Sequence, residues 1–213
     1  MQQMPFPMQA DNAHTLHVQV PTGPACGVVL MLHGMAEHAA RYEELQRFLA
    51  QQGYVAACYN HRGHGPEVPN EQLGYFADSQ GWSHLVSDAE VARQALAALH
   101  PDVPFILLGH SMGSFIAREY ALRYPEKLDA LILSGTGWHP RPLCALGSII
   151  ARITCALGGK RKPAGLLHYM AFSSHNKAFA PARTPMDWLS RDEQEVDLYM
   201  ADPLCGFAMT GGA

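Results

Sequence analysis

Ser111 is the residue of this chain that is best placed to do chemistry. It stands in Gly109-His110-Ser111-Met112-Gly113, between an apolar run at residues 105–108 and a helical pattern at residues 114–124. A Gly-x-Ser-x-Gly segment between a strand and a helix is typical of a nucleophile elbow, a turn so sharp that the serine hydroxyl stands clear of the backbone. The two glycines fit because a Cβ atom at either position would crowd the junction. The alternative is a helix cap, in which Ser111 only bonds a free amide.

A nucleophilic serine depends on two further kinds of group, a base and a set of hydrogen-bond donors. Its hydroxyl needs a base, usually a histidine oriented by a carboxylate, and the oxyanion of the tetrahedral intermediate needs hydrogen-bond donors. In an elbow protein the donors are the amide after the serine, here Met112, and an amide from the loop after an early buried strand. That loop is residues 33–38, and Met35 is predicted to supply the second amide, with Gly34 turning the backbone toward the site.

The elements that must hold these residues alternate between strand and helix. This alternation predicts an α/β fold, a mostly parallel sheet with helices on its faces. The predicted strands are residues 14–20 as an edge strand, 28–32, 105–108 and 130–133 as buried strands, and 54–58 as a further strand. The predicted helices are residues 42–52, 82–99 and 114–124.

The alternation ends after Gly135. Helical patterns follow near residues 143–157, 166–172 and 191–200. A helical insertion after a core strand often acts as a lid over a site. Connecting helices without a gating role are an equally good interpretation of the pattern.

The composition excludes several classes of protein. A net charge of −4 gives no reason to expect nucleic acid or an anionic membrane as partner, and 48% hydrophobic with 16% charged residues describe a globular chain. No apolar run approaches the length that spans a bilayer, and residues 1–10 lack the basic start and apolar stretch of a secretory signal.

The cysteines and histidines indicate neither disulfides nor metal. The five cysteines are odd in number and widely spaced, as expected for reduced thiols in a cytoplasmic protein. The twelve histidines show no local metal-binding spacing, so we predict no metal. No cofactor is predicted.

The chain resembles the monoacylglycerol lipase and lysophospholipase branch of the α/β-hydrolases over about residues 5–207. Four motifs carry the resemblance: His33-Gly34-Met35-Ala36-Glu37-His38 with Arg41-Tyr42, Asn60-His61-Arg62-Gly63-His64-Gly65, the Gly-His-Ser-Met-Gly elbow, and the stretch from Leu189-Ser190-Arg191-Asp192 to Asp202-Pro203-Leu204. The resemblance implies an α/β-hydrolase fold with a helical cap, and hydrolysis of carboxylic esters through an acyl-enzyme. By motif position it makes Ser111 the nucleophile and Met35 and Met112 the oxyanion donors.

The same resemblance suggests an organisation and a substrate. We expect the N-terminal part of an α/β-hydrolase core at residues 1–136, a helical cap at 137–204 and the start of a return to the core at 205–213. The implied partner is a small acyl ester of the monoacylglycerol or lysophospholipid type. Peripheral contact with lipid surfaces stays open, as does the oligomeric state.

The acid and histidine of a catalytic triad have no matching positions in these residues. An elbow fold places both after the serine, each beyond a further strand. No strand-like run precedes the candidate aspartates, and the candidate histidines come before all of them: Asp187, Asp192, Asp197, Asp202; His139, His168, His175. We therefore expect the acid and base beyond residue 213 and the last core strands missing, as in a C-terminally truncated hydrolase.

Two other functions stay open. One is a non-catalytic chain that binds an acyl ligand or a partner subunit, and the other is a proline-type serine peptidase, since the same elbow serves amides as well as esters. The Glu37-His38 loop and Asp202-Pro203-Leu204 favour the lipase branch.

Polar residues around the elbow have structural interpretations. Glu37, His38 and Arg41 are expected to form a hydrogen-bond network that holds the 33–38 loop. His61 and His64 lie in a turn and are expected to bond backbone groups.

Overall fold

The computed structural model describes residues 2–7, 13–138, 140–172 and 174–213, so His139 lies outside the described residues, as do residues 1 and 8–10 of the N-terminal segment considered above. Its centre is a six-stranded sheet in the order β1-β2-β4-β3-β5-β6. The strands are β1 (Gln2–Pro7), β2 (Ala13–Gln19), β3 (Gly27–Leu32), β4 (Tyr54–Tyr59), β5 (Phe105–His110) and β6 (Ala130–Ser134). Strands β3 to β6 run parallel, and β2 pairs antiparallel with both β1 and β4. The predicted mostly parallel sheet is confirmed.

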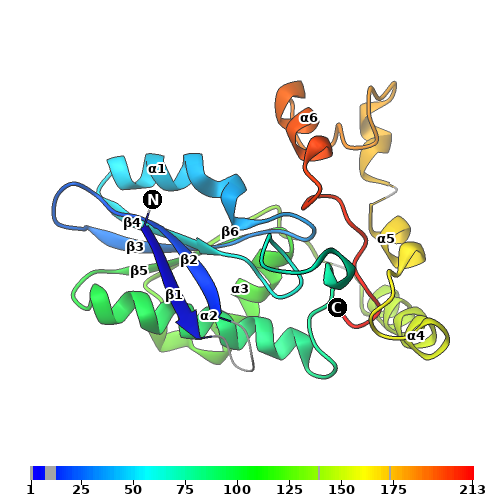
Figure 1. Cartoon of the computed structure of the whole chain (residues 1–213), viewed down its shortest axis with the longest axis horizontal. Coiled ribbons are helices and arrows are strands. Elements are labelled where there is room, and N and C mark those ends of the chain that lie inside the picture. The colour runs from blue at the N-terminus through cyan, green and yellow to red at the C-terminus, as the bar shows by residue number, and fades with distance from the viewer. Residues whose placement is uncertain (1, 8–12, 139, 173) are drawn as a thin grey trace.

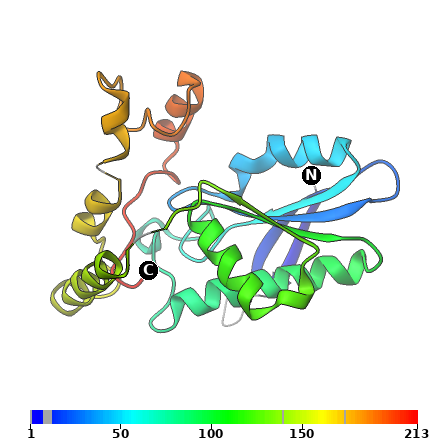
Figure 2. The ribbon, with the colours of Figure 1, turned by 180° about the vertical axis from the view of Figure 1, so that it is seen from behind.

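Helices cover both faces of the sheet (Figures 1 and 2). They are α1 (Glu43–Gln51) on one face, and α2 (Gly81–Leu99) and α3 (Met112–Arg123) on the other. Short 3-10 helices occupy Ala39–Tyr42, Asn70–Gln72, Pro125–Lys127 and His175–Phe179. Because helices lie on both sides, β3 is buried at every position, which explains its unbroken apolar sequence.

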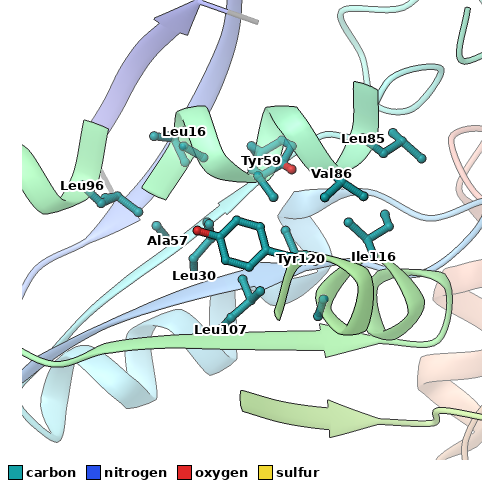
Figure 3. Close-up of a cluster of buried hydrophobic side chains, with 14 of the residues drawn as sticks. Leu16, Leu30, Ala57, Tyr59, Leu85, Val86, Leu96, Leu107, Ile116 and Tyr120 are labelled. Atoms are coloured by element: carbon teal, nitrogen blue, oxygen red, sulfur yellow. The ribbon is translucent and has the colours of Figure 1, made fainter. Parts of the chain in front are cut away.

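The main hydrophobic core lies between the sheet and the helices α2 and α3 (Figure 3). Side chains alternate along a strand, so β3 sends Leu30 into this core and Val29 and Met31 toward α1. The core side chains labelled in Figure 3 are Leu16, Leu30, Ala57, Tyr59 and Leu107 from the sheet, with Leu85, Val86, Leu96, Ile116 and Tyr120 from the helices.

Two expectations about the strands are wrong. The segment expected as an edge strand, β2, lies between β1 and β4. The pattern missed β1 because Pro5 and Pro7 interrupt it, although proline is tolerated in an edge strand such as this one. The strand at 130–133 is present as β6, but it is exposed rather than buried at all its positions. An apolar run cannot reveal that its strand lies at the border of the sheet, with a neighbour on one side only among the described strands.

The second part of the chain is helical. It contains α4 (Arg141–Gly158), α5 (Gly165–Phe172) and α6 (Glu193–Ala201), within one to two residues of the predicted ends. Figure 1 shows these helices beside one end of the sheet, outside the layers that α1, α2 and α3 form. Their division from the core as a separate domain stays a prediction.

Helix α4 bears on the expectation that no apolar segment approaches the length that spans a bilayer. None of its residues is buried, and it is the one helix of the described chain that is long and apolar enough to cross a membrane. A single helix of this kind is weak evidence for a membrane span.

The segment after α6 contacts both the sheet region and the helical part. The Thr210 amide donates to the Gly74 carbonyl at 3.0 Å, and the Gly212 amide donates to the Lys160 carbonyl at 2.8 Å. Met209 is buried in the main core.

Candidate active site

Ser111 occupies a strained turn between β5 and α3. Its backbone angles are φ 51° and ψ −117°, a conformation that costs a non-glycine residue about 1–3 kcal/mol. The Ser111 amide is fixed by the Ser134 carbonyl of β6, at 2.9 Å. A strained serine backbone that a neighbouring strand holds by a hydrogen bond is expected in a nucleophile elbow.

The glycines of the elbow allow backbones to approach closely. A Cβ atom on Gly109 would lie 2.3 Å from the Gly113 carbonyl oxygen, and one on Gly113 would lie 2.0 Å from the Leu32 carbonyl oxygen. Both distances are far below van der Waals contact, so the junction of β3, β5 and α3 depends on these two residues.

The loop at residues 33–38 lies directly beside the serine. A Cβ atom on Gly34 would be 3.3 Å from the Cβ of Ser111. The loop therefore lies close enough to Ser111 to supply the predicted second oxyanion donor.

The amides of this loop have different partners. The Gly34 amide donates to Glu37 Oε1 at 2.5 Å. No hydrogen bond from the amides of Met35 or Met112 is found within the described part of the chain. These two amides are available for an oxyanion, although their catalytic role stays a prediction.

The loop bends at a residue other than the expected one. Ala36, not Gly34, has the left-handed backbone, with φ 53°. Gly34 is needed instead for space, because a Cβ atom there would also lie 2.8 Å from Glu37 Oε1.

Two buried histidines hold the loop from the side of the core. His64 accepts a hydrogen bond from the Ala36 amide on Nε2 at 3.1 Å, while its Nδ1 donates to the Arg62 carbonyl at 2.9 Å. His33 accepts from the His61 amide on Nε2 at 3.0 Å, and its Nδ1 donates to the Gly34 carbonyl at 2.8 Å.

Burial lowers the pKa of both His33 and His64 to about 3. Each ring is therefore neutral at physiological pH, with one nitrogen as donor and the other as acceptor. This agrees with the interpretation of His64 as a residue that bonds backbone groups.

Glu37 is the centre of a second network, as expected. Its carboxylate accepts from the Tyr42 hydroxyl at 2.9 Å and from Arg41 Nε at 3.3 Å, besides the Gly34 amide. Burial and the neighbouring Glu37 charge raise the pKa of Tyr42, so its hydroxyl remains a donor.

The helical part of the chain also holds the loop, which the sequence did not reveal. The Tyr199 hydroxyl at the end of α6 donates to the Ala36 carbonyl at 3.0 Å, and the Gly206 amide donates to the same oxygen at 2.9 Å. His38 Nε2 lies 2.7 Å from Asp202 Oδ2. Tyr199 and Asp202 belong to a motif of the resemblance, but a position in a motif carries no information about a partner more than 160 residues away.

A base for Ser111 is not found among the described residues. The Ser111 hydroxyl has no hydrogen-bond partner in this part of the chain. The neighbouring His110 points elsewhere, with Nδ1 3.1 Å from Ser134 Oγ. The site thus combines an elbow and two unused amides without an imidazole at the hydroxyl.

A mostly parallel sheet covered on both faces, with a strained serine between β5 and α3, defines an α/β-hydrolase. The chain belongs to the family described as serine aminopeptidase, S33, whose family model matches residues 23–213.

Known proteins support the same class. The chain is 30% identical to a monoacylglycerol lipase of Mycolicibacterium smegmatis over 187 residues, 88% of this chain and 59% of that lipase. It is 30% identical to the monoglyceride lipase of Homo sapiens over 211 residues, 95% of this chain and 60% of that lipase. Among solved structures, a thermostable carboxyl esterase from Bacillus coagulans in complex with glycerol matches 99% of this chain and 69% of its own, with a TM-score of 0.88 and 26% identity. The chain thus spans about 60% of the length of the two lipases.

Proposed function

We propose that the protein hydrolyses carboxylic esters through an acyl-enzyme on Ser111. The observation that carries this proposal is the strained backbone of Ser111 beside the unused amides of Met35 and Met112. An oxyanion hole of two backbone donors stabilises the negative charge that develops on the ester oxygen during attack.

The reaction would proceed in two halves. Ser111 Oγ attacks the ester carbonyl carbon as a base takes its proton, and the alcohol leaves with a proton after the tetrahedral intermediate collapses. Water then attacks the acyl-serine by the same route and releases the carboxylic acid. General-base assistance contributes about 10²–10⁴-fold to such a rate, so a serine without a base reacts slowly.

We further propose a lipid monoester as substrate, of the monoacylglycerol or lysophospholipid type. The names of the two lipases support a glycerol ester. Helix α4 offers a surface for an acyl chain or a lipid, because it exposes a row of apolar side chains: Leu143, Leu146, Ile149, Ile153 and Leu157. Apolar residues three and four apart form one stripe on a helix.

A peptidase is the second candidate, because the family description names a serine aminopeptidase. The elbow and oxyanion donors serve amides as well as esters. A non-catalytic chain that binds an acyl ligand or a partner is the third.

Labelling with a fluorophosphonate probe tests the role of Ser111. We expect weak labelling of the 213-residue chain, a clear increase when imidazole is added as an external base, and loss of both in Ser111→Ala. Ser87→Ala on α2, whose hydroxyl donates to the Ser83 carbonyl, is the matched control and should label as the wild type does.

Each outcome has a separate meaning. Labelling that persists in Ser111→Ala would overturn the nucleophile. Strong labelling without imidazole would show that a base is already present. No labelling with imidazole, in a chain that is folded by circular dichroism, would favour the non-catalytic function. Parallel assays with a glycerol monoester and an amino-acid arylamide separate the lipase from the peptidase.

A further inference from the structure

Three side chains with metal-binding atoms meet where the 33–38 loop contacts the chain after α6. They are His38, Asp202 and Cys205, and their nearest ligand atoms all lie within 4.8 Å of one another. His38 precedes the first 3-10 helix, and the other two residues follow α6, 164 and more positions later. The prediction of no metal was based on local spacing, which cannot detect residues so far apart.

We propose that His38, Asp202 and Cys205 form a binding site for a divalent metal ion of the zinc type. Imidazole nitrogen, carboxylate oxygen and thiolate sulfur are the ligands that Zn²⁺ takes in proteins, and three protein ligands leave a fourth position open for water. Thiolate and carboxylate together balance the charge of the ion. This site does not depend on the reactivity of Ser111.

The ligands are partly ordered before an ion binds. The Asp202 carboxylate uses Oδ1 to accept from the Leu204 amide at 2.8 Å, which leaves Oδ2 to face His38. A hydrogen bond to the second oxygen of a ligating carboxylate is a common outer-shell device that orients the ligand. The side chains of His38 and Asp202 are only 10% and 28% exposed, so few rotamers compete with this arrangement.

Binding requires the three ligand atoms, which lie within 4.8 Å of one another, to rearrange around the ion. His38 Nε2 and Asp202 Oδ2 now share a hydrogen bond of 2.7 Å. Two ligands on a tetrahedral zinc ion, each about 2.0–2.1 Å from it, stand about 3.3 Å apart. The pair must therefore separate by a few tenths of an ångström, the proton between them must leave Nε2, and the thiol proton is released to solvent.

Among the described residues, the Arg41 guanidinium is a charge close to Asp202 and Cys205 that opposes the ion. Arg41 lies over the Tyr199 ring at 5.0 Å and pairs with Glu37 at 3.3 Å. Because Glu37 balances this guanidinium, the local charge apart from the three ligands is close to neutral. Metal binding would tie the 33–38 loop to the segment after α6 more firmly than the present hydrogen bonds do.

Cobalt(II) provides a direct test, since it takes the ligands of zinc and a thiolate–cobalt bond gives a charge-transfer band in the near ultraviolet. We expect the reduced wild-type chain to develop this band to a stoichiometry of one cobalt per chain, and Zn²⁺ to abolish it. Cys205→Ser should lose the band, and His38→Gln should weaken binding at least about tenfold, since even outer-shell partners contribute that much. Cys144→Ser, which removes an exposed thiol on α4, is the matched control.

A second measurement uses the wild-type chain alone, in case a variant fails to fold. Zn²⁺ should slow alkylation of Cys205 by iodoacetamide, mapped by mass spectrometry, and leave the rate at Cys144 unchanged. A cobalt band that survives in Cys205→Ser would overturn the site. So would an alkylation rate at Cys205 that does not respond to zinc.

Discussion

The backbone of Ala36 is held from two directions. Its amide is bound by His64 in the core, and its carbonyl is bound by Tyr199 and Gly206 from the other part of the chain. Because Ala36 follows Met35 directly, these bonds fix the amide that we propose as an oxyanion donor. The position of this proposed donor thus depends on residues outside both the elbow and the 33–38 loop.

Replacement of Tyr199 by Phe tests this arrangement. The substitution removes the 3.0 Å hydrogen bond to Ala36 and should lower the free energy of unfolding by about 0.5–1.5 kcal/mol, the usual net value of such a bond. Urea unfolding measures the change. Tyr169→Phe on α5, where the side chain is 67% exposed, is the matched control. Equal effects of the two substitutions would show that the Ala36 bond contributes nothing.

The two buried histidines that hold the 33–38 loop should lower the free energy of unfolding in mild acid. His33 and His64 have a pKa of about 3 when folded, whereas an unfolded histidine titrates near 6.5. Between these values the unfolded chain binds more protons, so acid favours unfolding by up to about 1.4 kcal/mol per pH unit for each histidine. Their contribution to stability is therefore fully present above about pH 6.5 and declines below it. Burial lowers the pKa of His17 and His168 too, with the same sign.

Urea unfolding at about pH 7 and pH 5.5 measures this dependence, and NMR of the imidazole protons identifies its source. Resonances of His33 and His64 should stay unchanged over this interval. A midpoint near pH 6.5 for either ring would contradict the burial argument.

A residue's role could be predicted from the sequence only where its partners lie close to it along the chain. Ser111, Met35 and Met112 lie in motifs formed by neighbouring residues, so their catalytic roles could be proposed from the sequence, and these roles stay predictions. The contacts of His64, Tyr199 and Asp202 join segments that are distant in sequence. A single sequence carries no signal for such pairs.

The turn after β4 and helix α2 are joined by an ion pair that is nearly buried. Arg62, in the turn after β4, binds both oxygens of Asp88 on α2, at 2.6 and 3.0 Å. The two side chains are 12% and 1% exposed. An ion pair this deep loses much of its stability when one partner is removed, because the other charge stays buried.

Asp88→Ala should therefore lower the free energy of unfolding by about 3–5 kcal/mol. The matched control is Glu43→Ala on α1, which removes the exposed Arg47–Glu43 pair of 3.2 Å and should cost less than about 1 kcal/mol. Thermal or urea unfolding distinguishes the two. A loss of less than 1 kcal/mol for Asp88→Ala would mean that water reaches the pair.

Most elements could be predicted, since their signals are periodic and local. The strands β3, β4 and β5 and the helices α1 to α6 begin and end within a few residues of the expected positions. Strand β1 was missed because prolines hide its pattern, and the exposure of β6 could not be foreseen because hydrophobicity shows a strand but not its neighbours.

The exposed apolar surface predicts how the 213-residue chain behaves as a whole. The β6 side chains of Leu131, Ile132 and Leu133 are 38%, 47% and 37% exposed. A border strand with apolar side chains is a site for pairing with other chains. We expect the chain to self-associate, and more strongly as its concentration rises.

Ile132→Lys should increase the monomer fraction measured by sedimentation velocity, since a lysine on a border strand opposes pairing. Leu122→Lys on α3, where the native side chain is 84% exposed, is the control and should leave association unchanged. A wild-type chain that stays monomeric at all concentrations would contradict the role of this surface.

The strand order also constrains when the sheet can form during synthesis. The central strand β3 pairs with β4 on one side and with β5 on the other. Roughly seventy residues separate the end of β3 from the start of β5. At a translation rate of about 5–20 residues per second, β3 waits on the order of 4–15 s with one side unpaired. During that interval this apolar strand, which is buried at every position in the folded chain, is open to chaperones and to other nascent chains on the same messenger RNA.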